Sequence, residues 1–451
     1  RVGYNEYIKK NITPLVDWFI HEEYTIEHYV ENFVETLKQA AQQELEEISP
    51  EQRKSYISAD TWQLIEERQK ARKQGLPEEE KRLNKVIKIK ANQDRQNANI
   101  ATLEQAGTLK ERWRGVNQHR KSSHPTSTNN STWKQKDKVG QRAEATAEYL
   151  EKKQWGNTNN TPPKLNPGKV HSQQLNIDCG CITRNELDCI LKKLKKDKAP
   201  GPDKAITELF KWFDTDNRDH LLGILNLCWS HEYVPDTTLE ANVASIFKKG
   251  HTKKLVNYRP ISLLTTFYKI IASVIQARLA TGLDHIVQPT QYGFRANRST
   301  SQALYLARRA QDLAEQSGIH LNMALLDWEK AFDKVDQARM AEALRRLDIP
   351  GKMIAVIMAL YRNPRFRVKH GDETSEFKPQ KYGIRQGCPL SPYLFILVMH
   401  VMFADIKDRK KDTIAKGIIL GFDFSEILYA DDTLLILRSK ESLEALLHEM
   451  K

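Results

Sequence analysis

The segment Glu426–Leu437 reads EILYADDTLLIL, and its pattern decides how the rest of the chain is interpreted. Apolar residues flank the acidic pair Asp431 and Asp432 on both sides, which is typical of a strand, a tight turn and a second strand. Aspartate is a common turn former, so a purely structural role is one interpretation. Two carboxylates at the tip of buried strands are expected to be desolvated and would repel each other unless a cation or a proton intervenes, and this favours a divalent metal.

A second apolar run also ends on an acid. In NMALLDWEKAFDKVD (Asn322–Asp336), the hydrophobic residues predict a strand over Met323–Leu326 that ends at Asp327. Two strands that present Asp327, Asp431 and Asp432 at one sheet edge would supply the carboxylates for a pair of Mg²⁺ ions about 3.5–4 Å apart. Mg²⁺ prefers a few carboxylates plus substrate phosphates, so these acids suffice. The pattern predicts a two-metal site that activates an attacking oxygen and neutralises a leaving pyrophosphate.

The overall charge indicates a polyanionic partner. The 451 residues include 70 Lys and Arg against 58 Asp and Glu, which gives a net charge of +12 and a pI of about 9.2. Such an excess favours binding to nucleic acid or to an anionic membrane surface. The longest apolar run, Leu394–Ala404, is too short to span a bilayer, and no secretory signal opens the chain. We therefore expect an intracellular protein without a membrane partner.

The cysteines are too few and too scattered for a disulfide framework. Cys179 and Cys181, together with Cys189, resemble part of a zinc site, but no second ligand pair follows at a suitable spacing. Reduced thiols are the preferred interpretation. The five cysteines are Cys179, Cys181, Cys189, Cys228 and Cys388.

The chain divides into three kinds of sequence. Residues 1–120 are helical in pattern, with 6 basic and 12 acidic residues over 1–62 and with 15 basic and 8 acidic residues over 63–121. The basic half fits a solvated helix face and a nucleic-acid arm equally well. Residues 121–172 are rich in Ser, Thr, Asn, Gln, Pro and Lys, which predicts a disordered linker. From residue 173 a mixed α/β pattern continues.

Local patterns predict elements within this mixed region. The spacing of Thr183 and Glu186 is that of a capping box, so a helix is expected to start there and to end before the prolines of DKAPGPD. Further helices are expected over roughly 264–283, over roughly 301–316 and from Ser391; hairpins are expected around 366–378, with a turn at Gly371–Asp372, and around Ala430–Asp431.

Taken together, these motifs resemble the reverse transcriptase domain of non-LTR (LINE-type) retrotransposons and, more loosely, that of group II intron proteins. The resemblance covers about residues 173–451, and one block alone is weak evidence whereas six in the family's order are specific. The blocks are KKDKAPGPD (Lys195–Asp203), IFKKG followed by NYRPISLL (Asn257–Leu264), QYGFR (Gln291–Arg295), LLDWEKAFDKVD, RQGCPLSPYLF and YADD.

The resemblance implies an α/β fold of the right-hand polymerase type. Fingers are expected over 173–322 and a palm with an antiparallel sheet over 323–451, with the helical residues 1–120 as an upstream extension. Lys204 occupies a position where the family commonly has glycine. The sequence also ends nineteen residues after Asp432, before the family's next motif and its thumb, so this piece is expected to extend primers poorly.

The resemblance also implies roles for individual residues. Asp327 and Asp431 would each bind both metal ions, which would be Mg²⁺ with Mn²⁺ as the alternative, and Asp432 would be a third, more peripheral carboxylate. Phe332 would lie under the sugar ring as a steric gate, although a plain core aromatic is the competing interpretation. Gln386 and Gly387 would contact the incoming nucleotide and the template. Arg259, together with Lys248 or Lys249, would bind the triphosphate.

Structural interpretations accompany these roles. Arg259 and Pro260 could simply fix an exposed turn. Asp333 and Asp336 are expected to be helix-start or surface acids rather than metal ligands, and Tyr429 is expected to pack in the palm.

The implied function is RNA-directed DNA synthesis. Its partners would be an RNA template, a DNA primer and dNTPs, and the nucleus is the expected compartment for retrotransposition, although the sequence shows no targeting signal. Two alternatives remain: an intron-maturase type of reverse transcriptase, and a truncated relic that binds nucleic acid without turnover. The sequence predicts no oligomeric state.

Overall fold

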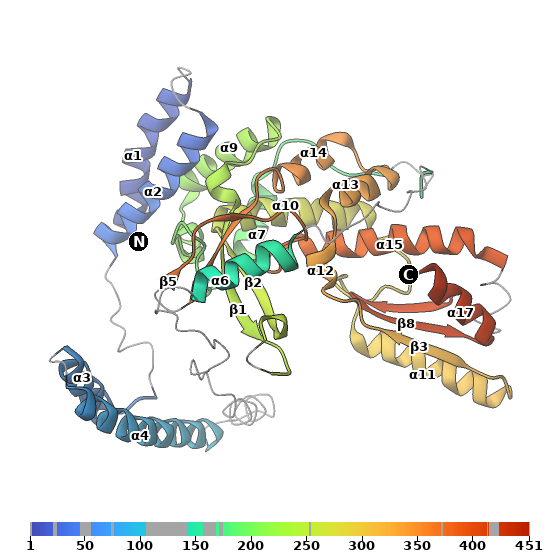
Figure 1. Cartoon of the computed structure of the whole chain (residues 1–451). Helices are drawn as coiled ribbons and strands as arrows, with labels where there is room; N and C mark the ends of the chain where they lie inside the picture. Colours follow the sequence, from blue (N-terminus) through green and yellow to red (C-terminus); the bar gives the residue numbers. More distant parts are fainter. Residues whose placement is uncertain are drawn as a thin grey trace. The chain divides into compact units, whose positions relative to one another are not determined.

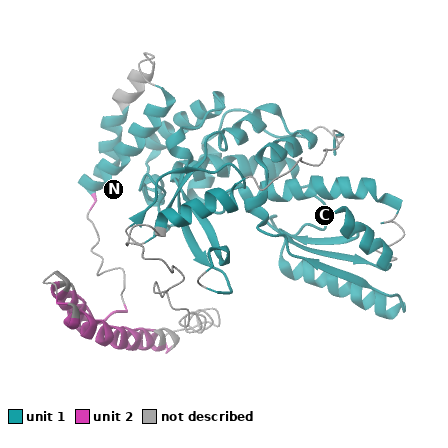
Figure 2. Ribbon diagram, in the orientation of Figure 1, with its two compact units in different colours: residues 1–44, 132–451 teal, residues 45–131 magenta. Residues whose placement is uncertain are grey.

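The computed structural model describes residues 2–20, 25–45, 56–73, 76–104, 142–156, 168–170, 175–251, 254–370, 373–412, 414 and 424–450. The chain forms two compact units, one of residues 1–44 and 132–451 and the other of residues 45–131 (Figure 2). None of the helices in the described part is both long and apolar enough to cross a membrane.

The smaller unit contains two packed helices, α3 (Ala59–Lys73) and α4 (Pro77–Glu104). Lys81 and Arg82 on α4 each form an ion pair with a glutamate three residues earlier, at 2.8 and 2.6 Å. Part of the basic helix face is therefore neutralised within α4 itself, in pairs that lie on the exposed surface and contribute little stability.

The first two helices belong to the larger unit. Residues 1–120 were expected to form one helical extension, whereas they are divided between the two units. The hydroxyl of Tyr4, a fully buried residue, donates to the backbone carbonyl of Leu209 (3.1 Å). The carboxylate of Glu27 accepts from the hydroxyl of Tyr233 (2.6 Å). Such buried and part-buried contacts attach α1 and α2 to the residues around Leu209 and Tyr233 of the same unit. The helices concerned are α1 (Val2–Ile20) and α2 (Ile26–Glu44).

A five-stranded sheet lies in the larger unit, with the strand order β2-β1-β4-β5 and with β6 paired to β4. β1 and β2 form an antiparallel hairpin, and β4 is added to β1 in parallel. The antiparallel pairing of β4 with β5 confirms the hairpin expected around 366–378, whose turn at 371–372 lies outside the described residues. The strands are β1 (Glu240–Phe247), β2 (Tyr258–Leu264), β4 (Arg365–His370), β5 (Glu373–Thr374) and β6 (Lys378–Pro379).

Helix α7 begins at the predicted capping box. The hydroxyl of Thr183 accepts from the N–H of Glu186, whose carboxylate accepts in return from the N–H of Thr183 (2.8 Å). Arg278 on α10 binds the same carboxylate through Nε and Nη2 at 2.7 and 2.9 Å, so it fastens α7 to α10. The helices of this region are α7 (Arg184–Lys193), α8 (Thr207–Lys211), α9 (Thr215–Ser230) and α10 (Thr266–Leu283), with the short turns η4 (Asp236–Leu239) and η5 (Leu255–Asn257).

The expected linker over 121–172 contains an ordered segment, so the prediction of disorder is wrong for residues 142–156. They form α6 (Arg142–Tyr149) and a π-helical turn, η3 (Leu150–Gln154). Leu150 and Trp155 are 3% and 2% exposed and pack against strands β1 and β4. With the buried Ala143 and Ala147, they supply apolar surface that the polar composition of the whole stretch obscured. The other parts of the linker, apart from 168–170, lie outside the described residues.

A three-stranded antiparallel sheet has the order β3-β8-β7 and confirms the expected antiparallel palm sheet (Figure 1). α11 packs on one face of this sheet, where Ala310 of α11 joins a buried cluster with Ile427 of β7 and Ile436 of β8. α17 contacts β8 and β3. The helices predicted over 264–283, over 301–316 and from Ser391 are confirmed as α10, α11 and α15. The elements are β3 (Asn322–Leu326), β7 (Glu426–Tyr429), β8 (Asp432–Leu437), α11 (Thr300–Gln316), α12 (Ala331–Lys334), α13 (Gln337–Arg346), α14 (Gly351–Ala359), α15 (Ser391–Arg409) and α17 (Lys440–Glu449).

Candidate active site

The acidic pair lies at the turn between β7 and β8. Tyr429 is paired with Asp432, so Ala430 and Asp431 form a two-residue hairpin turn. Ala430 has a φ of 60°, in the left-handed region that the tightest hairpin turns require at a central residue. The turn therefore places the two acids at the tip of the hairpin, as the sequence pattern predicted.

The register of β3 brings the third aspartate to the same edge. β3 ends at Leu326, which lies opposite Thr433 on β8. The next residue, Asp327, therefore falls beside Asp432, and residues that lie opposite each other on paired strands project to the same face. Asp327 and Asp432 are exposed and Asp431 is half-buried. The expectation of desolvated carboxylates is therefore wrong, because the strand ends open to solvent and water screens their mutual repulsion.

The chemistry of this edge fits a divalent cation that is completed by substrate. Among the described residues, no three His, Cys, Asp or Glu side chains converge closely enough to hold a metal ion by themselves. Mg²⁺ does not need such a protein cage, since it takes one or two carboxylates and fills its remaining positions with phosphate and water oxygens. Asp327, Asp431 and Asp432 offer that kind of open, oxygen-only donor set.

The turn that carries Asp431 is supported by two residues, Gln291 and Gly293, to which the sequence assigned no individual role. Gln291 is 1% exposed, and its Oε1 accepts from the N–H groups of Ala430 (3.0 Å) and Gly293 (2.8 Å). A Cβ on Gly293 would lie 2.2 Å from the nitrogen of Ala430, so only glycine allows this approach. The QYGFR block therefore holds the turn that carries Asp431. The signal available in the sequence was a glycine two residues after a glutamine in a non-helical block.

The ring of Phe332 is held by two aromatic neighbours. It stacks on Phe395 of α15 with a centroid distance of 4.9 Å and an interplanar angle of 12°, and it meets Phe294 edge-on at 6.1 Å. Its backbone carbonyl accepts from the N–H of Ile384 (2.8 Å). Phe332 is half-buried, so the ring is fixed in place while part of it stays accessible to a ligand.

Gln386 and Gly387 lie against strand β2. The carbonyl of Gln386 accepts from the N–H of Ser262 (2.7 Å). Gly387 has a φ of 119°, and a Cβ there would lie 2.4 Å from the carbonyl oxygen of Ser262. Glycine is therefore required at 387 both by the backbone conformation and by the close approach.

Asp333 was expected at a helix start or on the surface, and the second expectation is wrong. It is 2% exposed, and its carboxylate accepts from Nε2 of Gln154, Nε1 of Trp155 and Nε2 of Gln386, each at 2.9 Å. Burial raises the pKa of the Asp333 carboxyl, and the hydrogen bonds from Trp155 and Gln154 oppose that rise. Asp336, by contrast, caps α13 as expected, since its side chain accepts from the N–H of Arg339 (2.9 Å).

The three expected triphosphate ligands lie on the β1–β2 hairpin. Arg259 is within β2, directly opposite Ile246, so the interpretation of Arg259–Pro260 as a turn is wrong. Lys248 and Lys249 directly follow the end of β1. All three cations are exposed. They belong to the five-stranded sheet, or directly follow one of its strands, whereas the aspartates lie at the edge of the three-stranded sheet.

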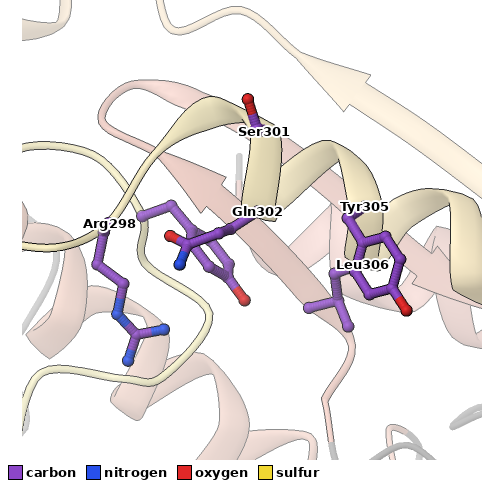
Figure 3. A pocket seen from close by; sticks show the side chains of 6 residues that line it. Arg298, Ser301, Gln302, Tyr305 and Leu306 are labelled. Atoms are coloured by element: carbon purple, nitrogen blue, oxygen red, sulfur yellow. The ribbon is translucent and has the colours of Figure 1, made fainter.

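A hollow of about 330 Å³ lies at the N-terminal end of α11 (Figure 3). The guanidinium of Arg298 lies 5.4 Å from the ring centroid of Tyr292, and Tyr305 is 68% exposed. Tyr292 precedes Gly293, so one wall of the hollow is continuous with the segment that supports the aspartate turn. The lining residues are Tyr292, Arg298, Ser301, Gln302, Tyr305 and Leu306.

Comparison with known proteins identifies related sequences. Residues 246–451 match the family model described as "Reverse transcriptase (RNA-dependent DNA polymerase)". The chain is 29% identical over 264 residues to the "Transposon TX1 uncharacterized 149 kDa protein" of Xenopus laevis. The aligned region covers 58% of this chain and 20% of that protein. It is 28% identical over 278 residues to the "RNA-directed DNA polymerase from mobile element jockey" of Drosophila melanogaster, which covers 60% and 29%.

A third relative is the "Retrovirus-related Pol polyprotein from type-1 retrotransposable element R2" of Nasonia vitripennis, 27% identical over 261 residues, with 57% of this chain and 24% of that protein covered. The chain thus spans between 20% and 29% of the length of these three relatives. Among solved structures, a telomerase from Candida tropicalis aligns with 48% of this chain and 46% of that chain, at 14% identity and a TM-score of 0.37.

Proposed function

We propose that this chain, whose residues 246–451 match the reverse transcriptase (RNA-dependent DNA polymerase) family model, carries the fingers and palm of an RNA-directed DNA polymerase of a non-LTR retrotransposon. The observation that carries the proposal is the placement of Asp327, Asp431 and Asp432 at one edge of the β3-β8-β7 sheet, within the matched region. The fingers extend over 173–322 and the palm over 323–451.

The reaction is nucleotidyl transfer from a dNTP to a primer on an RNA template. The primer 3′-oxygen forms a bond to the α-phosphorus, the bond between that phosphorus and the bridging oxygen breaks, and pyrophosphate leaves while the hydroxyl proton passes to water. Two divalent ions, Mg²⁺ or alternatively Mn²⁺, supply activation of the 3′-oxygen and neutralisation of the leaving group when bound. Asp327 and Asp431 hold both ions, and Asp432 is a peripheral third carboxylate.

The remaining site residues select and position the nucleotide. The ring of Phe332 lies under the sugar and excludes a 2′-hydroxyl, which its stacking on Phe395 supports because a fixed ring cannot yield. Gln386 and Gly387 contact the incoming nucleotide and template. Arg259, with Lys248 or Lys249, binds the triphosphate, a role that their exposure on the β1–β2 hairpin allows.

The partners of the reaction are an RNA template, a DNA primer and dNTPs. The net charge of +12 supports a nucleic-acid partner, since phosphate contacts dominate affinity for such ligands. Retrotransposition places the reaction in the nucleus.

A single-nucleotide addition assay tests the proposal. The chain is incubated with poly(rA)/oligo(dT), dTTP and Mg²⁺, and incorporation of the first nucleotide is measured beside binding of the template–primer. We expect incorporation by the wild-type chain and none by Asp431→Asn. Salt-dependent binding without incorporation by the wild-type chain would instead identify a nucleic-acid-binding module without turnover.

A further inference from the structure

Residues 142–156, which we call the upstream strap, connect the five-stranded sheet with the segment that follows Asp327 (Figure 1). At one end, Leu150 and Trp155 pack with Val243 and Phe366, and the rings of Trp155 and Phe366 meet edge-on at 4.6 Å. The strap is therefore anchored on the sheet that carries the exposed cations, by a well-packed apolar contact.

The other face of the strap reaches α12 and Lys330, the residue that precedes it. The ammonium of Lys330 lies 5.6 Å from the ring centroid of Tyr149, and Gln154 and Trp155 both donate to Asp333 at 2.9 Å. The π-helical turn makes this possible: the N–H of Trp155 bonds to the carbonyl of Leu150, five residues earlier (2.7 Å). The wider turn lets two consecutive side chains reach one carboxylate, and π-turns often occur at functional sites.

The hydrogen bonds to Asp333 determine which way the amide of Gln386 points. An ionised carboxylate only accepts hydrogen bonds, and the indole Nε1–H of Trp155 only donates. Nε2 of Gln386 must therefore face Oδ2 of Asp333 (2.9 Å), which turns its Oε1 away from the carboxylate. Gln386 is half-buried, so this oxygen is presented as an acceptor at the part-open site.

We propose that Asp333 is a positioning residue that holds the Gln386 amide in one orientation, and that Gln154 and Trp155 complete its hydrogen bonding, so that the upstream strap is part of the nucleotide site. This inference rests on the proposed polymerase function. A buried carboxylate without its donors is costly, so loss of either strap donor loosens Asp333 and with it Gln386. A fixed Oε1 accepts from a hydroxyl or amino group of the nucleotide or template, and a loose one does so less often.

The test compares two tryptophans in the full chain. Trp155→Phe removes the indole N–H but retains most of the ring packing. Trp229→Phe is the matched control. Trp229 on α9 is also 2% exposed, but it donates its Nε1–H to the carbonyl of Cys179 (3.1 Å), in the segment that precedes α7. Both variants are expected to lower the melting temperature to a similar degree. Only Trp155→Phe is expected to lower kcat/KM for dTTP, by about three- to tenfold, the equivalent of one hydrogen bond.

A double-mutant cycle separates positioning from plain stability. In a Gln386→Met background, Trp155→Phe is expected to have no further effect on kcat/KM, since no amide remains to be oriented. The same cycle is measured by equilibrium binding of dTTP with a chain-terminated primer in Ca²⁺, a readout that needs no turnover. A loss of stability with unchanged kcat/KM, or an equal effect of Trp155→Phe with and without Gln386, overturns the inference. A wild-type chain that neither adds nor binds dTTP overturns the proposed function itself, together with this inference.

Discussion

The side-chain oxygen of Gln291 accepts a hydrogen bond from the N–H of Ala430 at 3.0 Å, across 139 residues of sequence. Ala430 is the first residue of the turn that carries Asp431, and its φ of 60° is a conformation that an L-residue adopts only when its surroundings impose it. The aspartate turn is therefore held by a contact outside its own hairpin, and the position of Asp431 depends on the QYGFR block.

Gly293→Ala should disrupt this support. The added Cβ would lie 2.2 Å from the nitrogen of Ala430, so either the turn or the Gln291 segment must move. Overpacking of this kind costs about 1–3 kcal/mol, and we expect at least a tenfold loss of kcat in single-nucleotide addition. Gly351→Ala is the control, because a Cβ at Gly351 meets no atom within 4 Å. Wild-type kcat in Gly293→Ala would show that the turn does not depend on this contact.

Asp327→Asn and Asp431→Asn should each abolish primer extension while binding of the RNA–primer duplex stays nearly intact. A neutral amide cannot hold two divalent ions against phosphate charge. Asp432→Asn should be harmful but less complete, since this carboxylate is proposed to be peripheral. Extension and duplex affinity are measured in parallel over a Mg²⁺ titration. Substantial polymerisation by Asp431→Asn would remove the catalytic assignment.

Phe332→Val should admit ribonucleotides at least tenfold better, measured as the ratio of kcat/KM for rGTP to that for dGTP. The ring is stacked on Phe395, so a 2′-hydroxyl cannot displace it. Overpacking costs about 1–3 kcal/mol, which is equivalent to about one or two decades of discrimination against ribonucleotides. Phe395→Leu is the packing control, because it loosens the ring without removing it. A lower activity on both substrates with a flat ratio in Phe332→Val would indicate a core aromatic.

Acid should weaken the attachment of α7 to α10. The hydrogen bonds from Arg278 lower the pKa of the Glu186 carboxyl to about 2, so the native state holds this group ionised more strongly than the unfolded chain does. The stabilisation is complete above the unfolded pKa of 4.5 and is lost as the pH falls from there towards about 2. Glu186→Gln should lower the free energy of unfolding by about 1–3 kcal/mol at pH 7, and the difference from wild type should shrink below pH 4. Glu342→Gln is the control: the ion pair of Glu342 with Arg345 is exposed, so this variant should change the free energy of unfolding little.

Lys204→Gly should stabilise the protein. Lys204 has a φ of 60°, in the left-handed region that glycine adopts without a steric cost. A non-glycine residue in the left-handed region costs about 1–2 kcal/mol, and the greater freedom of glycine in the unfolded chain offsets part of that gain. We expect a net increase of about 0.5–1 kcal/mol in denaturant unfolding, and no change in Lys204→Ala, which keeps the strain. Equal stabilities of the glycine and alanine variants would contradict the strain argument.

Local sequence patterns predicted the elements that depend on nearby residues. The capping box of Thr183 and Glu186, the strand that ends at Asp327 and the hairpin at Ala430–Asp431 all involve partners within a few positions, and each is confirmed in the structure. The roles of the site residues remain predictions. The burial of Asp333 was not predictable in this way, because its donors Gln154 and Trp155 lie 179 and 178 residues away.

The polar composition of residues 121–172 led to a wrong prediction of disorder, because a few apolar side chains within this stretch are buried. The polar stretch over 121–172 contains Ala147, Leu150 and Trp155, and these buried side chains pack residues 142–156 against a sheet formed much later in the sequence. The aspartates were expected to be desolvated because they follow apolar strands. Burial of a strand does not extend to its ends, and the exposure of Asp327, just after β3, and of Asp432, the first residue of β8, reflects that.

The same long separations bear on when the protein acquires its site during synthesis. Contacts between distant residues form late, since the chain entropy of closing a large loop must be overcome before the contact is made. Asp333 receives one donor from the Gln386 side chain, 53 residues downstream, and two from a segment almost 180 residues upstream. A nascent chain that has not yet reached Gln386 therefore lacks one of the three donors to Asp333, and the proposed nucleotide site can be completed only after Gln386 has been translated.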